Sequence, residues 1–206
     1  MHLPKVIIFD LDGTLFNFTV DYAKLPSKRI NNKPVWDPTE SEIQEFKKTY
    51  KIFEDVQNIL DDIKHRRDRQ ESLNSRSHPG RESTIKIGIA SKAHFVPKGI
   101  KVLEIFNLLD YFDPDLIFLQ CTNKTEHFQK IKNSYDNKYD QIISYEDMLF
   151  FDDDKGNITT ICRLGCSGYL CNDRGVTWDN YLKGLRMHDD NFENKRRFPD
   201  NFLTDF

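Results

Sequence analysis

Short apolar runs that each end in polar side chains constrain this chain more than any other sequence feature. The first run, over residues 5–10, is rich in β-branched and aromatic residues and stops at Asp-Leu-Asp-Gly-Thr. A buried strand of a parallel sheet has this composition, because both of its faces are covered. Further strands are expected over residues 85–90, 116–119, 148–151 and 167–171.

The segments between these runs have apolar residues at helical spacing. Thr39 is the expected N-cap of one or two amphipathic helices that end near His65, since Glu42 follows three residues later. Later helices are expected over residues 96–109, 125–133, 157–163 and 178–187. Strands that alternate with helices predict an α/β fold with a parallel sheet, helices on both faces and right-handed crossovers.

Three segments lack both patterns. Residues 17–38 contain three prolines and an Asn-Asn pair, which predict a loop or an irregular flap. Residues 64–84 hold six Lys or Arg against three acids and are expected to form a solvated basic loop. We therefore expect a single domain over residues 1–187, with 17–84 as a flap, helix and basic loop insertion, followed by an irregular tail over 188–206.

Composition limits the compartment and the partners. The 33 acids and 30 bases give a net charge of −3, which argues against nucleic acid as a partner. The apolar runs fall far short of the ~18 residues that a membrane span needs, so neither a membrane nor secretion is expected. Four cysteines without a Cys-x-x-Cys pair fit a reducing cytoplasm or nucleus. We expect a cytoplasmic monomer in which Cys162, Cys166 and Cys171 are buried thiols rather than zinc ligands.

Polar residues follow several of the predicted strands, and ligands of parallel sheets bind beyond the carboxyl ends of the strands. The residues expected at these ends are Asp10, Asp12, Ser91, Lys124, Asp152, Asp153 and Asp154. Carboxylates gathered at one edge would repel one another unless a cation lay between them, and all-oxygen ligands select Mg²⁺. Lys124 and Ser91 could hold phosphoryl oxygens on the other side. The pattern predicts a magnesium-assisted phosphate site.

Each of these residues taken singly has a simpler explanation. A Ser at a strand end is commonly a cap, and a lone Lys is commonly a solvated surface group. Residues 152–154 could merely cap the helix that follows them, because Asp stabilises a helix N-terminus. Order and placement favour the site over these alternatives.

In order and placement, Asp10-Leu11-Asp12-Gly13-Thr14-Leu15, Ser91, Lys124 and Asp152-Asp153 resemble the four motifs of the haloacid dehalogenase superfamily of phosphotransferases. More narrowly, the stretches 123–128, 150–154 with 157–158, and 163–165 are similar to the small eukaryotic magnesium-dependent, acid-phosphatase-like phosphatases. The likeness covers residues 3–16 and 85–185. It implies a three-layer Rossmann-like core with little or no cap domain.

The resemblance also implies a two-step hydrolysis of phosphomonoesters. Asp10 would attack phosphorus and form an aspartyl-phosphate, while Asp12 would protonate the leaving alcohol and later deprotonate water. Mg²⁺ would be held by Asp10, the backbone carbonyl of Asp12 and the Asp152/Asp153 pair. Ser91, Lys124 and backbone N–H groups near Leu11 and Lys92 would hold the phosphate oxygens. Gly13 would allow the sharp turn, and Thr14 could bond back to fix it.

Two residues depart from the narrower family. Gly13 stands where an aromatic residue is common, and Lys92 where Arg is common after the motif-two Ser. Lys loses a planar two-point grip on an anion, so a difference in substrate preference is expected from this change. The expected substrates are phosphorylated small molecules or phosphoproteins, which by resemblance include phosphotyrosine proteins, phosphosugars and glycated amines.

The residues leave other functions open. A catalytically weak phosphate-binding or scaffold protein could share the fold and recruit partners through the basic loop or the tail. A phosphoacceptor signalling domain also clusters Asp and Lys on a parallel sheet, but its paired acids follow the first strand. Asp12 disfavours a dehalogenase, and the irregular stretch 16–84 disfavours a phosphomutase, which needs a cap that excludes water.

Overall fold

A five-stranded parallel sheet forms the centre of the molecule. A computed structural model of the chain describes residues 2–77, 84–120, 122–139 and 141–197. The sheet order is β5-β4-β1-β6-β7. The strands are β1 (Val6–Phe9), β4 (Lys86–Ser91), β5 (Ile117–Leu119), β6 (Met148–Asp152) and β7 (Ser167–Leu170). The predicted α/β fold is confirmed, and each strand begins and ends within one residue of its expected bounds.

Strand β1 lies in the middle of the sheet and is buried along its whole length. Its alternate side chains enter two separate cores, because successive residues of a strand point to opposite faces. Ile7 and Phe9 pack in one core, and Val6 and Ile8 in the other. The continuous apolar run seen in the sequence therefore reflects a strand covered on both faces.

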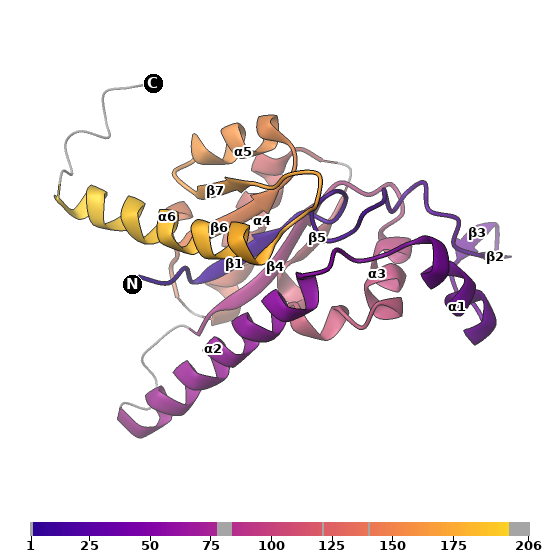
Figure 1. The fold of residues 1–206 in the computed structure, drawn as a ribbon, viewed down its shortest axis with the longest axis horizontal. Helices are drawn as coiled ribbons and strands as arrows, with labels where there is room; N and C mark the ends of the chain where they lie inside the picture. Colours follow the sequence, from indigo (N-terminus) through magenta and orange to yellow (C-terminus); the bar gives the residue numbers. More distant parts are fainter. Residues whose placement is uncertain (1, 78–83, 121, 140, 198–206) are drawn as a thin grey trace.

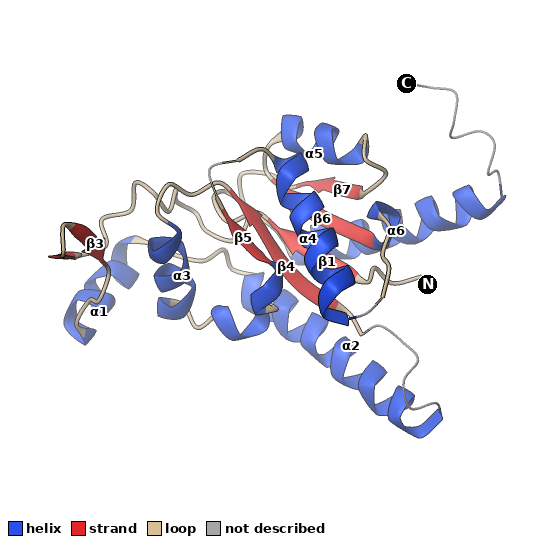
Figure 2. Cartoon of the chain, turned by 180° about the vertical axis from the view of Figure 1, so that it is seen from behind, coloured by secondary structure: helices blue, strands red, loops and turns tan. Residues whose placement is uncertain are grey.

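Helices cover both faces of the sheet, which gives three layers (Figures 1 and 2). One core contains apolar residues of α2 (Val56–Ser77), α3 (Val96–Ile105) and α6 (Trp178–Arg197). The other contains residues of α4 (Lys124–Tyr139) and α5 (Lys155–Cys162). Short 3₁₀ helices at Leu109–Tyr111, Pro114–Leu116 and Tyr145–Asp147 complete the connections. No helix in the described part of the chain is long and apolar enough to cross a membrane.

The segment predicted to be an irregular flap contains a β-hairpin. Strands β2 (Lys28–Ile30) and β3 (Lys33–Val35) pair antiparallel and are exposed throughout. Asn31 and Asn32 form the turn with φ values of 52° and 60°. Two consecutive residues with positive φ make the turn whose twist suits a two-residue hairpin, and Asn tolerates that conformation. The hairpin lies beside α1 (Glu40–Thr49), away from the main sheet (Figure 1).

Helix α1 begins where the sequence predicts it. The Thr39 hydroxyl accepts from the backbone N–H of Glu42, and the Glu42 carboxylate accepts from the backbone N–H of Thr39. This reciprocal capping satisfies two N–H groups that would otherwise lack partners.

The expectation of a basic loop over 64–84 is wrong for residues 64–77, which continue helix α2. Asp62 and Arg66 pair at 2.6 Å, one helical turn apart, and this spacing supports a helix without an apolar stripe. The C-terminal half of α2 extends away from the sheet (Figure 1). The remaining part of the predicted loop, residues 78–83, lies outside the described residues.

Other boundaries also differ from the prediction. Helix α6 continues ten residues beyond its predicted end, so an irregular tail from 188 is wrong up to Arg197. The rest of the predicted tail, residues 198–206, lies outside the described residues. Helix α4 ends six residues later than expected. Cys166 and Cys171 are buried as expected, but Cys162 is exposed.

Candidate active site

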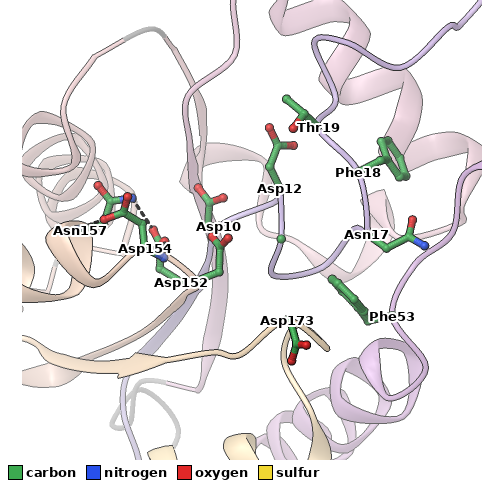
Figure 3. A pocket seen from close by; sticks show the side chains of 12 residues that line it. Asp10, Asp12, Asn17, Phe18, Thr19, Phe53, Asp152, Asp154, Asn157 and Asp173 are labelled. Atoms are coloured by element: carbon green, nitrogen blue, oxygen red, sulfur yellow. Dashed lines mark hydrogen bonds between the residues drawn. The ribbon is translucent and has the colours of Figure 1, made fainter.

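A cavity of about 440 Å³ opens at the carboxyl end of the sheet (Figure 3). Acidic side chains from the turn after β1, the end of β6 and the loop after β6 form one part of its wall, and residues 17–19 face them. The lining residues are Asp10, Asp12, Gly13, Asn17, Phe18, Thr19, Phe53, Asp152, Asp153, Asp154, Asn157 and Asp173. Five carboxylates predicted from the sequence therefore share one cavity.

The position of Asp10 follows from the sheet register. Asp10 comes directly after β1, and its backbone N–H donates to the carbonyl of Phe151 on β6 over 3.0 Å. This bond brings Asp10 next to Asp152, which ends β6. After Asp10 the chain turns back: the Leu11 carbonyl accepts from the N–H groups of Leu15 and Phe16, each over 2.9 Å.

Lys124 joins the two buried carboxylates. It is the first residue of α4 and is 3% exposed. Its ammonium donates to Asp10 Oδ1 and the Ala90 carbonyl, and lies 3.0 Å from Asp152 Oδ2. Although burial disfavours its charge, Asp10 and Asp152 raise the pKa of Lys124. The lysine is thus a fixed cation rather than the solvated group of the simpler explanation.

The carboxylates outnumber this single cation. Burial, together with the charges of Asp152 and Asp12, raises the pKa of Asp10 to about 7 despite Lys124. Burial raises the pKa of Asp12 to about 6, and nearby Asp21 and Asp153 act in the same direction. Burial and the charge of Asp152 also raise the pKa of Asp153. The site therefore has more negative charge than its own groups compensate.

Asp152 is held by the start of helix α5. Its Oδ1 accepts from the backbone N–H of Asp154 over 2.7 Å, and its Oδ2 accepts from Asn157 Nδ2 over 3.0 Å (Figure 3). Asp154 itself caps α5 by accepting from the Asn157 N–H over 2.8 Å. The capping explanation is therefore correct for Asp154, while Asp152 points to Lys124.

Gly13 makes room for Asp153. A Cβ atom at position 13 would lie 2.2 Å from Asp153 Oδ2, and Gly13 has a φ of 68°. Both the space and the backbone conformation therefore require glycine. The aromatic residue expected here from the resemblance is therefore replaced by glycine because of the position of Asp153.

The donor chemistry of the cavity fits Mg²⁺. The acidic lining offers oxygen ligands only, and the raised pKa values of Asp10, Asp12 and Asp153 reflect negative charge that a cation would compensate. Within the described residues, no group of three or more His, Cys, Asp or Glu side chains is arranged to hold a metal as it stands. Asp10 and Asp152 instead turn toward Lys124.

Not every predicted residue lies on this cavity. Ser91 is buried at the end of β4, Lys92 is exposed beside it, and neither belongs to the described lining. Lys124 is also absent from the lining, because it is buried against Asp10 and Asp152. The Leu11 side chain is buried in the core. Thr14 stabilises the turn through its backbone N–H, which donates to the Leu11 carbonyl over 3.3 Å. Its buried hydroxyl has no hydrogen-bond partner among the described residues, so Thr14 bonds back through the backbone and not through its side chain.

The sequence reasoning missed the wall opposite the carboxylates. Phe18 belongs to a segment without a clear pattern, and Phe53 is expected within a helix but lies in the connection between α1 and α2. The Phe53 ring lies over Gly175, where a Cβ atom would be 2.1 Å away. Asp173 follows β7, so the rule that ligands bind beyond strand ends could have identified it.

Comparisons with known proteins agree with this geometry. The sequence pattern of the acid phosphatase family matches residues 2–191. The human protein named magnesium-dependent phosphatase 1 is 26% identical over 164 residues, which span 79% of this chain and 75% of that protein. A HAD-superfamily hydrolase from Ehrlichia chaffeensis shares the fold, with a TM-score of 0.51 and 15% identity over 93% of this chain and 99% of the other.

Proposed function

Because this chain belongs to the acid phosphatase family and has the haloacid dehalogenase fold, we propose that it hydrolyses phosphomonoesters with Mg²⁺ through an aspartyl-phosphate on Asp10. That it is a phosphatase follows from the family. The metal, the intermediate and the substrate are the parts that we propose. The observation that carries the proposal is that Asp10 and Asp152, which line one acidic cavity, both contact the buried ammonium of Lys124.

Asp10 is the proposed nucleophile. Its carboxyl group is buried beside the cavity, and its contact with Lys124 favours the ionised form, which is the form that attacks phosphorus. Attack on phosphorus forms the Asp10–phosphate bond and breaks the bond to the leaving alcohol. The ammonium of Lys124 then stabilises the negative charge that is spread over the transferring group.

Asp12 is the proposed acid and base. Burial raises its pKa to about 6, which suits a carboxyl group that gives up and takes back a proton near neutral pH. The backbone N–H of Val20 donates to Asp12 Oδ1 over 2.9 Å and so holds the carboxylate at the cavity wall. Asp12 would protonate the leaving oxygen and then remove a proton from the water that hydrolyses the intermediate.

Mg²⁺ would be held by Asp10, the backbone carbonyl of Asp12 and the Asp152/Asp153 pair. When bound, it would neutralise the excess carboxylate charge so that an anionic phosphate can approach. Ser91 and backbone N–H groups near Leu11 and Lys92 would hold the remaining phosphate oxygens. We further propose phosphotyrosine proteins, phosphosugars or phosphorylated glycated amines as substrates, because the Phe18 and Phe53 rings on the facing wall can pack against a ring of the substrate.

The direct test is hydrolysis of p-nitrophenyl phosphate with Mg²⁺ by the wild type and by Asp10→Asn. We expect Asp10→Asn to lose at least ~10³-fold in kcat, because a carboxamide cannot act as the nucleophile. Asp154→Asn is the matched control: it lies on the same cavity, and Asn caps a helix as well as Asp does. Chelation should abolish wild-type turnover, and added Mg²⁺ should restore it.

Two results would contradict parts of the proposal. Wild-type activity in Asp10→Asn would exclude the aspartyl-phosphate, and full activity after chelation would exclude the metal. If the wild type binds Mg²⁺ but turns over no phosphoester in a broad panel, the chain is better described as a phosphate-binding or scaffold protein.

A further inference from the structure

A buried lysine stands where a helix normally disfavours a cation. Lys98 lies in the first turn of α3, is 5% exposed, and its ammonium donates to the carbonyl of Asp21 over 2.7 Å. The N-terminal end of a helix is positively polarised, and burial adds a desolvation cost for the ammonium. Such a placement needs an anionic or carbonyl partner to compensate it, and the partner comes from the turn at Asp21.

The turn that Lys98 contacts is the one that holds Asp12. It spans residues 19–23, where the N–H groups of Tyr22 and Ala23 donate to the Thr19 carbonyl over 3.1 and 3.0 Å. Thr19 lines the cavity, and the N–H of Val20 donates to Asp12 Oδ1. The turn therefore connects α3 to the proposed acid and base.

A second contact fastens the same turn to the loop after β4. Asp21 Oδ2 accepts from the backbone N–H of His94 over 2.9 Å and lies 2.7 Å from His94 Nδ1. The turn is thus attached at two points, through the Asp21 carbonyl to Lys98 and through its carboxylate to His94. These contacts are independent, because one uses the backbone and the other the side chain of Asp21.

Charge links Lys98 to Asp12 as well. Burial lowers the pKa of Lys98, and the negative charges of Asp21 and Asp12 oppose that shift. Asp12 is therefore within electrostatic range of a cation that belongs to neither the metal ligands nor the phosphate contacts of the proposed function.

We propose that Lys98 is a positioning residue for Asp12: by holding the Asp21 carbonyl, it fixes the Val20 N–H against the Asp12 carboxylate and orients the group that protonates the leaving alcohol. This inference rests on the proposed function, in which Asp12 is the acid. The consequence is specific to proton transfer, because the contacts of Lys124 with Asp10 and Asp152 do not pass through this turn.

The test compares kcat/KM for two aryl phosphates of similar shape. The p-nitrophenolate of p-nitrophenyl phosphate leaves readily without protonation, whereas the more basic phenolate of phenyl phosphate depends on the acid. In Lys98→Met we expect at least ~10-fold loss with phenyl phosphate and less than ~3-fold with p-nitrophenyl phosphate. Lys101→Met is the control, since Lys101 lies on the same helix and pairs with Glu104 at the surface.

Lys98→Gln supplies a second variant, which removes the charge and shortens the side chain that donates to the Asp21 carbonyl but keeps a polar group at the buried position. It should show the same dependence on the leaving group, and it decides the question if Lys98→Met does not fold. An equal loss with both substrates, or no loss with either, would overturn the positioning role. Failure of the wild type to hydrolyse both substrates with Mg²⁺ would instead overturn the proposed function, before any variant is compared.

Discussion

Two buried polar clusters lie at opposite ends of the same sheet. At the carboxyl end, Asp10, Asp152 and Lys124 are ionisable groups that contact one another beside a cavity. At the other end, Ser167 begins β7, and its hydroxyl lies 3.1 Å from His188 Nδ1 on α6 and accepts from Asn191 Nδ2 over 3.2 Å. The first cluster carries charge, whereas the second joins a helix to a strand through uncharged groups.

The two clusters respond to protons in opposite directions. Asp10 has a raised pKa, so the folded state loses stability as pH rises from about 4 toward about 7 and the carboxyl ionises. Burial and the charge of His2 lower the pKa of His188 to about 4, below its ordinary value of about 6.5. The contribution of His188 is therefore complete above about pH 6.5 and is lost as pH falls toward 4. Buried charge is kept beside the cavity at the carboxyl end of the sheet, and a neutral polar contact is kept at the opposite end.

Replacement of Lys124 should have the largest effect on the difference between the two clusters in how stability depends on pH. Lys124→Met leaves Asp10 and Asp152 buried without a cation, which costs about 3–5 kcal/mol of unfolding free energy at pH 8. The loss of unfolding free energy should be smaller at pH 5, where Asp10 is protonated. In turnover assays, kcat should fall at least ~100-fold. Urea unfolding at both pH values, in chelator, measures the effect. Lys138→Met is the control, because Lys138 lies on the same helix as Lys124 and its pair with Asp115 is exposed. A larger loss of unfolding free energy at pH 5 than at pH 8 would show that Lys124 does not act by compensating the buried carboxylates.

Two glycines with positive φ allow a matched comparison of the two ends. Gly13→Ala places a Cβ against Asp153, whereas a Cβ at Gly165, which precedes β7 and has a φ of 95°, would meet no described residue closer than 3.8 Å. Both variants should lose about 1–2 kcal/mol of stability from backbone strain. Only Gly13→Ala should also lose activity, by at least ~10-fold, because Asp153 must move. Thermal unfolding and p-nitrophenyl phosphate turnover together check this, and equal activity in both variants would argue against a role for Asp153.

The smallest expected effect concerns the uncharged cluster. His188→Asn keeps a group that can bond to Ser167 but cannot take up a proton in this pH range. Between pH 7 and pH 5 we expect the wild type to lose about 1–2 kcal/mol more stability than this variant. Activity at pH 7 should not change. His65→Asn, at an exposed position on α2, is the control, and a wild-type pH dependence in His188→Asn would show that His188 is not the group responsible.

The sequence predicted those features that depend on local pattern and on topology. The run over Val6–Phe9 identifies a buried strand, and the rule for parallel sheets then places Asp10 and Asp152 at one edge without further information. The same reasoning could not find the extension of α2, because its stability comes from charged pairs such as Asp62 with Arg66 rather than from an apolar stripe.

Other features depend on contacts between distant segments. Lys98 looks like any surface lysine until the turn at Asp21 is placed against it. Gly13 looks like an ordinary turn glycine until Asp153 is placed over it. The side of the cavity that bears Phe18 and Phe53 is likewise set by tertiary packing, which single-sequence periodicity does not report.

The central place of β1 in the sheet also has a consequence for the order of folding. Phe9 pairs with Ile89 on one side and with Phe151 on the other, so both neighbours of the first strand are made much later in the chain. Pairing between such distant segments is slow, because long loops must close before the contacts form. A chain growing from its N-terminus therefore carries Asp10 long before Lys124 and Asp152 exist, and we expect phosphatase activity to arise only after most of the protein has been synthesised.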